Sequence, residues 1–147
     1  MPIPKDPKKR AYMFSDDMKF LQKAIVWHET ERKFLALKRP ESAFSRPECW
    51  DLPGGNVLYG QTHIDSLNEE IKEETTLEVE NIKPLKVTTN YDKEKEVYFL
   101  FIGYECKAKA GEIKLSEEHV DYKWLTKEEF LQLESADFLV ELVNLIN

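Results

Sequence analysis

Four glutamates lie between positions 69 and 74, within the segment LNEEIKEETTLEV. On a helix, at about 100° per residue, Glu70 and Glu74 stack on one face beside an apolar stripe. Glu73 lies next to them, whereas Glu69 points away toward solvent. Two like charges at i and i+4 destabilise a helix by about 0.2–0.5 kcal/mol, but a hard cation such as Mg²⁺ binds carboxylate oxygens. The segment therefore predicts a metal site or, in the alternative interpretation, a solvated acidic face.

A Pro53-Gly54-Gly55 turn precedes this helix, and Gly55 lies six residues before Gln61. Glycine allows the backbone to approach a ligand closely and frees a carbonyl group to face a metal ion. An ordinary tight turn is the alternative interpretation of this triplet. The turn and the acidic helix together favour the metal site.

The composition is that of one globular domain. The chain has 147 residues, of which 41% are hydrophobic and 33% charged, and this length suits a single hydrophobic core. The formal net charge is −7, which excludes the basic surface that duplex nucleic acid requires. Any bound phosphate must therefore be held by local cations, from Lys, Arg or a metal.

The cysteine spacing and the N-terminal segment indicate a cytoplasmic protein. Cys49 and Cys106 have no C-x-x-C spacing, so we expect neither a zinc site nor a disulfide, which fits a reducing compartment. The N-terminal segment lacks the apolar core of a signal peptide, and no stretch reaches the ~18 apolar residues of a membrane span.

The hydrophobic pattern predicts strands, a helix, more strands and then helices. Strands are expected at 20–28, 33–39, 96–108 and 120–125, with a strand, turn and strand at 77–92. A helix is expected at about 62–75, capped by Thr62 or Asp65. A second helix begins at a capping box of Thr126 with Glu129, and an amphipathic helix follows at the C-terminus. This order predicts a mixed sheet between helices.

The acidic helix and its turn resemble the signature of the Nudix (MutT-like) hydrolase family, G-x5-E-x7-R-E-U-x-E-E-x-G-U, where U is a bulky aliphatic residue. Six of the nine fixed positions match, at Gly55, Glu70, Ile71, Glu73, Glu74 and Leu77. The other three hold Gln61, Glu69 and Thr76 in place of glutamate, arginine and glycine. The flanking segments CWDLPGG, KFLALKR and SEEHVDYKWLTKEEF are also similar, so the resemblance covers most of residues 20–135.

The resemblance implies an α/β fold, an α/β/α sandwich around a mixed β-sheet. We expect one Nudix hydrolase-like domain over 1–147, with 1–15 as an N-terminal tail or edge segment. It also implies hydrolysis of a diphosphate linkage in a nucleoside diphosphate joined to another group, X. Mg²⁺, or Mn²⁺ in its place, would be the cofactor of this hydrolysis. The expected substrate is a small nucleotide or nucleotide sugar, without a nucleic-acid duplex or membrane partner, and the family often forms homodimers.

The same resemblance assigns the site residues. Glu70, Glu73 and Glu74 would hold the metal together with the carbonyl group of Gly55. The general base would be one of these glutamates, with Glu70 and Glu73 as candidates, or a carboxylate on a later loop.

Glu118 is our candidate for that loop carboxylate. Glu117 competes with it, and a solvated glutamate is an equally good interpretation. His119 is interpreted as a structural residue. Arg39 could bind a substrate phosphate, or it could be an ordinary surface arginine at the end of a strand. Four aromatic residues could stack on a base or belong to the core: Trp27, Phe44, Trp50 and Tyr91.

The departures from the signature leave a second function open. An arginine at position 69 would hold a catalytic glutamate by a charge-assisted hydrogen bond, which Glu69 cannot donate. The amide of Gln61 can donate to Glu69, and we hypothesise that these two side chains pair. We expect the helix exit at Thr76 to differ from that of a glycine. The alternative function is therefore a weak or inactive Nudix-fold module that binds a nucleotide, and a scaffold domain with merely solvated glutamates is a third.

Overall fold

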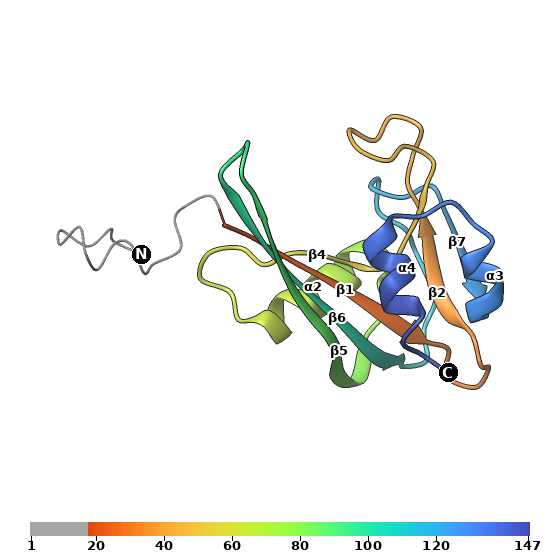
Figure 1. The fold of residues 1–147 in the computed structure, drawn as a ribbon. Coiled ribbons are helices and arrows are strands. Elements are labelled where there is room, and N and C mark those ends of the chain that lie inside the picture. The colour runs from red at the N-terminus through yellow and green to blue at the C-terminus, as the bar shows by residue number, and fades with distance from the viewer. Residues whose placement is uncertain (1–17) are drawn as a thin grey trace.

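The computed structural model describes residues 18–147, so the expected tail or edge segment at 1–15 lies outside the described residues. The elements follow in order (Figure 1): β1 (Met18–Trp27), β2 (Phe34–Lys38), β3 (Trp50–Asp51), β4 (Gly54–Asn56), α2 (His63–Thr75), β5 (Val79–Asp92), β6 (Val97–Ala108), β7 (Asp121–Leu125), α3 (Lys127–Leu131) and α4 (Asp137–Val143). Within the described residues, no helix is long and apolar enough to cross a membrane.

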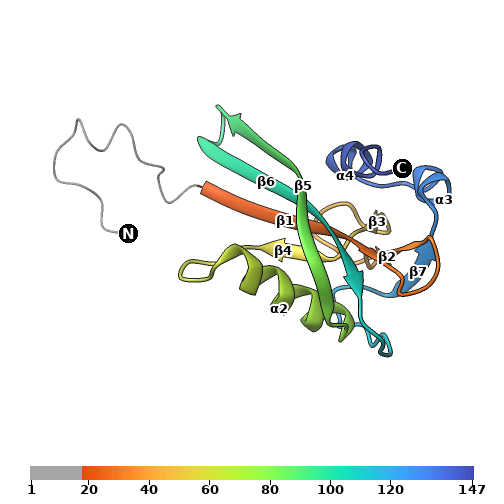
Figure 2. The ribbon, with the colours of Figure 1, turned by 90° about the horizontal axis from the view of Figure 1, so that it is seen from below.

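The strands form one mixed sheet with helices on both faces. Its order is β3-β2-β1-β6-β5, with β4 paired to β1 and β7 paired to β2. The β1–β6 pair is parallel, and the other pairs are antiparallel. Helix α2 covers one face, and α3 and α4 cover the other (Figure 2). This arrangement confirms the expected α/β/α sandwich.

Alternating strand residues supply the two halves of the core. In β2, Phe34 and Ala36 pack in the cluster that contains the apolar side chains of α3 and α4. Their neighbours Leu35 and Leu37 pack in the cluster that contains Leu67 and Ile71 of α2. The period of two along the strand therefore directs successive side chains to opposite helical layers. The predicted strand at 33–39 is confirmed as β2, which pairs antiparallel with β1.

The segment expected to form a strand, a turn and a strand is one continuous strand, β5. It pairs with β6 from Val79 to Asp92, with register shifts between Glu80 and Lys83 and between Pro84 and Lys86. A proline has no N–H to donate, so it is accommodated at such an irregularity and does not end the strand. The prediction of a turn here was wrong because long-range pairing with β6 overrides the local breaker.

Both ends of α2 are fixed by threonine. The Thr62 side chain accepts a hydrogen bond from the Asp65 N–H, so Thr62 is the N-cap and Asp65 is not. Thr76 adopts the left-handed conformation at φ 66°, which a glycine would adopt at less cost. Its N–H donates to the Lys72 carbonyl, and its hydroxyl donates to the Glu112 carbonyl at 2.7 Å. The expectation that the helix exit would differ was wrong, because the helix ends in the usual left-handed turn, to which the threonine adds a contact that glycine lacks.

Candidate active site

A cleft of about 740 Å³ is lined by side chains of both charges. Residues of β1, β4 and α2 form part of its wall, and the loops at 39–46 and 118–119 complete it. Its acidic lining residues are Asp51, Glu70, Glu74 and Glu118, and its basic lining residues are Lys19, Lys23, Arg39 and Arg46. A cleft with carboxylates beside cations can bind a metal ion and a polyanion together.

Glu74 is the most deeply buried carboxylate of the acidic helix. Its side chain is 3% exposed, and its Oε1 accepts a hydrogen bond from the Gly54 N–H at 2.8 Å. Burial raises the pKa of Glu74 to about 8, although Lys23 and the Gly54 N–H act in the opposite direction. An ionised carboxylate here is costly without a partner cation, so the position suits a metal ligand.

Gly55 leaves the space that the Glu70 side chain occupies. A Cβ atom at Gly55 would lie 2.7 Å from the carboxyl carbon of Glu70, well inside van der Waals contact. The pKa of Glu70 is raised, first by burial and then by the charges of Glu73 and Glu118. The turn and the helix are therefore fitted to each other, which supports the interpretation of both as one site.

Asp51 organises the basic wall of the cleft. It is 1% exposed and accepts from Lys23 Nζ at 3.2 Å and from Arg39 Nη1 at 3.2 Å. Burial acts to raise the pKa of Asp51, but the Lys23 charge, the nearby His119 ring and the hydrogen bond from the Leu52 N–H hold it well below its usual range. Asp51 and Lys23 were not predicted from the sequence as site residues. The signal was available, because each is a charged residue within an apolar strand segment.

His119 lies between the two buried carboxylates. Its Nδ1 is 3.6 Å from Oε2 of Glu74, and its Nε2 is 3.9 Å from Oδ2 of Asp51. The residue is 5% exposed, and neither ring nitrogen has a hydrogen-bond partner among the described residues. One ligand atom from each of Glu74, Glu118 and His119 lies within 4.8 Å of the others. The histidine that we interpreted as structural therefore lines the cleft, between Glu74 and Asp51.

The hypothesis that Gln61 pairs with Glu69 is confirmed. Gln61 Nε2 donates to Glu69 Oε2 at 3.0 Å, and the Leu58 N–H donates to Gln61 Oε1 at 2.9 Å. The amide thus ties the exposed Glu69 to the loop before α2. Glu69 is exposed and is not among the residues that line the cleft, although its charge contributes to the raised pKa of Glu70.

The remaining predicted residues divide between the cleft and other places. Arg39 lines the cleft, and its Nε donates to the Ser45 carbonyl at 3.0 Å. Glu118 also lines it, whereas Glu73 and Glu117 are exposed and lie outside the lining of the cleft as described.

None of the four candidate aromatic residues lines the cleft formed by the described residues. Trp50 is in the core, Phe44 is fully exposed, and Tyr91 packs on Tyr98. Trp27 packs against Phe34, at the end of β1. The aromatic residue at the cleft is Phe99 of β6, which our sequence analysis missed because its strand has a continuous aromatic and apolar pattern.

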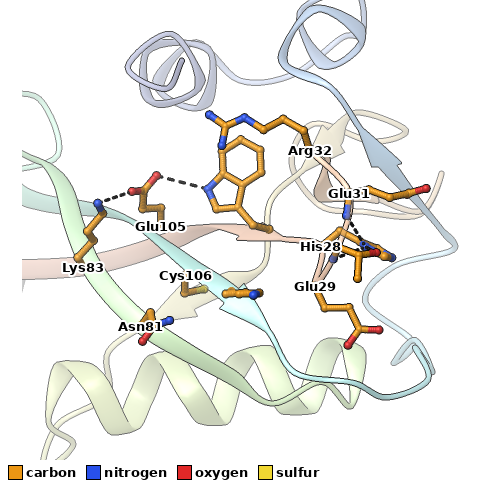
Figure 3. A pocket seen from close by; sticks show the side chains of 11 residues that line it. His28, Glu29, Glu31, Arg32, Asn81, Lys83, Glu105 and Cys106 are labelled. Atoms are coloured by element: carbon orange, nitrogen blue, oxygen red, sulfur yellow. Dashed lines mark hydrogen bonds and ion pairs between the residues drawn. The ribbon is translucent and has the colours of Figure 1, made fainter.

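A second cavity of about 490 Å³ is lined by the end of β1, the β1–β2 turn and the strands β5 and β6 (Figure 3). Glu105 forms an ion pair with Lys83 at 2.8 Å and accepts from the Trp27 indole N–H at 3.4 Å. The Arg32 guanidinium lies over the Trp27 ring, 4.7 Å from its centre. The central carboxylate of this cavity is thus already neutralised, as Asp51 of the cleft is by Lys23 and Arg39.

The donor atoms of the cleft fit a hard divalent cation. Glu70 and Glu74 offer carboxylate oxygens with raised pKa values, and Gly55 lies against Glu70. Oxygen donors of this kind are those that Mg²⁺ prefers.

Comparison with known proteins agrees with this geometry. The NUDIX domain family model matches residues 21–144. The chain is 29% identical over 106 residues to nucleoside triphosphatase NudI of Salmonella arizonae, covering 66% of this chain and 75% of the relative. It is 27% identical over 112 residues to the NudI of Escherichia coli, and this match covers 70% of this chain and 79% of the relative.

Solved structures share the fold. The MutT NUDIX hydrolase of Burkholderia pseudomallei superposes with a TM-score of 0.72 at 20% identity, covering 90% of this chain and all of that chain. The NUDIX domain of Shewanella oneidensis NrtR, solved with ADP ribose, superposes with a TM-score of 0.70 at 18% identity. The match covers 95% of this chain and 90% of that chain. The match of the family model over most of the chain shows that this protein belongs to the Nudix (MutT-like) hydrolase family, enzymes that act on phosphorus-containing anhydrides.

Proposed function

We propose that this protein is a Mg²⁺-dependent nucleotide pyrophosphohydrolase that cleaves a diphosphate linkage in a nucleoside diphosphate-X substrate. The observation that carries the proposal is the cleft itself, where the carboxylates Glu70 and Glu74 share one lining with Lys23 and Arg39. Nucleoside triphosphates are the first substrates to test, because two similar proteins are named nucleoside triphosphatases.

In this proposal, Glu70, Glu73, Glu74 and the Gly55 carbonyl hold the metal. A bound Mg²⁺, or Mn²⁺ in its place, would neutralise phosphate oxygens and lower the pKa of the attacking water. Glu73 is exposed at the border of this group, and its charge raises the pKa of Glu70. It would therefore contribute from the solvent side.

The other lining residues bind the substrate and transfer the proton. Arg39 and Lys23 hold phosphate oxygens, and Asp51 fixes the direction of both side chains. Glu118, an exposed loop carboxylate at the cleft, accepts the proton of the attacking water, with Glu70 and Glu73 as the other candidates for this role. The water oxygen forms a bond to phosphorus, and the bridging P–O bond breaks.

The cleft size and charge also favour a small-molecule substrate. A volume of about 740 Å³ suits a nucleotide or nucleotide sugar, and the net charge of −7 disfavours duplex nucleic acid. A cytoplasmic location and a homodimer complete the proposal. Cys49 and Cys106 are free thiols, and free thiols fit the reducing compartment of this proposal.

A nucleotide-binding module without turnover is the second candidate. The observation that favours it is the Gln61–Glu69 hydrogen bond, which replaces the glutamate and arginine of the family signature. The NUDIX domain of NrtR, whose structure contains ADP ribose, is an example of this fold with a bound nucleotide.

The test is a panel of nucleoside triphosphates, oxidised nucleotides, ADP-ribose, nucleotide sugars and dinucleoside polyphosphates, each with Mg²⁺ and with Mn²⁺. We expect release of a nucleoside monophosphate by the wild type and a loss of at least about 100-fold in Glu74→Gln. Glu78→Gln is the matched control, because Glu78 is 63% exposed and pairs only loosely with Lys72 at 3.8 Å. Nucleotide binding without any hydrolysis would refute the enzyme and support the binding module.

A further inference from the structure

We propose that His119 joins Glu74 and Glu118 in a nitrogen-containing cation site that favours Mn²⁺ and similar transition metals over Mg²⁺. The proposal rests on the proposed function, because it concerns the same cleft. It deepens that function by naming the class of metal that one position of the cleft accepts and the residue that selects it.

The contact between Glu74 and His119 has the geometry of two ligands of one ion. Glu74 uses Oε1 to accept from the Gly54 N–H, which leaves Oε2 facing Nδ1 of His119 at 3.6 Å. That separation is too long for a hydrogen bond. Two atoms bound at about 2.0–2.2 Å to one ion, at 90–110° to each other, lie roughly 2.8–3.6 Å apart, and the observed separation is at the upper end of this range.

The opposite nitrogen of His119 faces a buried carboxylate, as the second nitrogen of a metal-bound histidine commonly does. Nε2 faces Oδ2 of Asp51 at 3.9 Å, and Asp51 is held in place by Lys23 and Arg39. A carboxylate behind a histidine fixes the tautomer and strengthens the other nitrogen as a ligand. With the proton of Nε2 directed to Asp51, the lone pair of Nδ1 is directed to Oε2 of Glu74.

An independent observation shows that the histidine lacks a partner. His119 is 95% buried, since only 5% of it is exposed, and both ring nitrogens are without a hydrogen bond among residues 18–147. An unsatisfied buried polar group costs about 1–3 kcal/mol, so its retention calls for an explanation. Coordination of a cation at Nδ1 would satisfy it.

The backbone holds the loop close to the helix that supplies Glu74. The Ser116 N–H donates to the Glu74 carbonyl at 3.3 Å, and the Val120 N–H donates to the Lys38 carbonyl at 2.9 Å. The segment between these anchors carries both Glu118 and His119. Glu118 is exposed, so its carboxylate can close on an ion at little cost.

The imidazole nitrogen among the donor atoms determines the preference of this site for Mn²⁺ over Mg²⁺. Mg²⁺ is bound almost entirely by oxygen and is reluctant to exchange water for nitrogen. Imidazole nitrogen raises affinity for first-row transition metals. Removal of His119 should therefore weaken Mn²⁺ binding far more than Mg²⁺ binding, whereas removal of Glu74 should weaken both.

The experiment uses the purified full chain with Mn²⁺ alone, without a nucleotide. Pulsed EPR of bound Mn²⁺ detects a directly coordinated ¹⁴N, and the hexaaqua Mn²⁺ signal gives the Kd. For wild type we expect ¹⁴N coupling, which His119→Gln loses. The Kd for Mn²⁺ should rise at least about tenfold in this variant, while that for Mg²⁺, measured by competition, changes less than about twofold. His63→Gln is the matched control, since the His63 side chain is exposed at the start of α2.

The outcomes are distinct. Bound Mn²⁺ without ¹⁴N coupling in the wild type overturns the proposal, and this result needs no variant to fold. Coupling that persists in His119→Gln, or equal loss of Mg²⁺ and Mn²⁺ affinity, also overturns it. If ¹⁴N coupling depends on His119 but no substrate is hydrolysed, the metal site stands and the proposed hydrolase fails.

Discussion

Replacing Gly55 by alanine should separate the function of the turn from the stability of the fold. A Cβ atom there would lie 2.7 Å from both Cδ and Oε2 of Glu70. Ordinary contact distances are about 3.5–4.0 Å, so the carboxylate must move by roughly 1 Å. A misplacement of about 1 Å costs on the order of 100-fold in rate, which corresponds to roughly 2.7 kcal/mol.

The stability of this variant should change little. The clash is with the far end of a flexible, half-buried side chain, and the φ of Gly55 lies outside the left-handed range. Alanine also restricts the unfolded chain, which offsets part of the strain by about 0.4–1 kcal/mol. We therefore expect the free energy of unfolding to change by less than about 1 kcal/mol.

The assays are urea unfolding, Mg²⁺ binding by calorimetry and kcat/KM with the substrate that the panel identifies. Gly111→Ala is the matched control, because a Cβ atom there would meet only Leu77 at 3.8 Å. A folded Gly55→Ala protein with wild-type Mg²⁺ affinity and wild-type kcat/KM would refute the assignment of the turn and Glu70 to one metal site. A loss of Mg²⁺ affinity and kcat/KM of the same size in Gly111→Ala would also contradict this assignment.

Three further predictions concern the buried charges, the altered signature and the thiols. Asp51→Asn should lower stability by roughly 3–5 kcal/mol at pH 7, because Lys23 is left buried without its partner. The pKa of Asp51 is held below its ordinary value of 3.8. The stability that ionised Asp51 contributes is thus present above about pH 4 and is lost on further acidification. Urea unfolding should therefore show that the difference in free energy of unfolding between wild type and Asp51→Asn narrows toward about pH 2. Gln61→Glu combined with Glu69→Arg should retain the contact at positions 61 and 69 and raise kcat about 10-fold or more. Burial and the charge of Glu105 raise the pKa of Cys106 to about 12, so a thiol reagent at pH 8 should label only the other cysteine until the protein unfolds.

Each of these has a result that contradicts it. If the difference in free energy of unfolding between wild type and Asp51→Asn stays constant with pH, the buried ion pair does not stabilise the fold. An unchanged kcat in the double variant would show that positions 61 and 69 do not limit turnover. Mass spectrometry that finds rapid labelling of Cys106 in the native state would show that its surroundings open readily.

The helices and most strands were predictable because their signals are local. The i, i+3 and i+4 pattern of α2 and the capping residues Thr62 and Thr126 act within a few residues of the chain. Strand alternation in β2 determines which side chain enters which helical layer. The segment at 77–92 is the exception, since its pairing partner β6 outweighs the local effect of Pro84.

By itself, the sequence determined the fold class, the acidic helix and the Gly55 turn, since each depends on neighbours along the chain. Only the tertiary structure decided that Asp51 would hold Lys23 and Arg39, and that His119 would lie between Asp51 and Glu74. These contacts join positions that are 28 and 45 residues apart in the pairs Lys23–Asp51 and Glu74–His119. Their geometry depends on strand register and on where a loop returns to the sheet. A one-residue change in register would turn Lys23 to the other face, which is why a periodic pattern cannot specify the site.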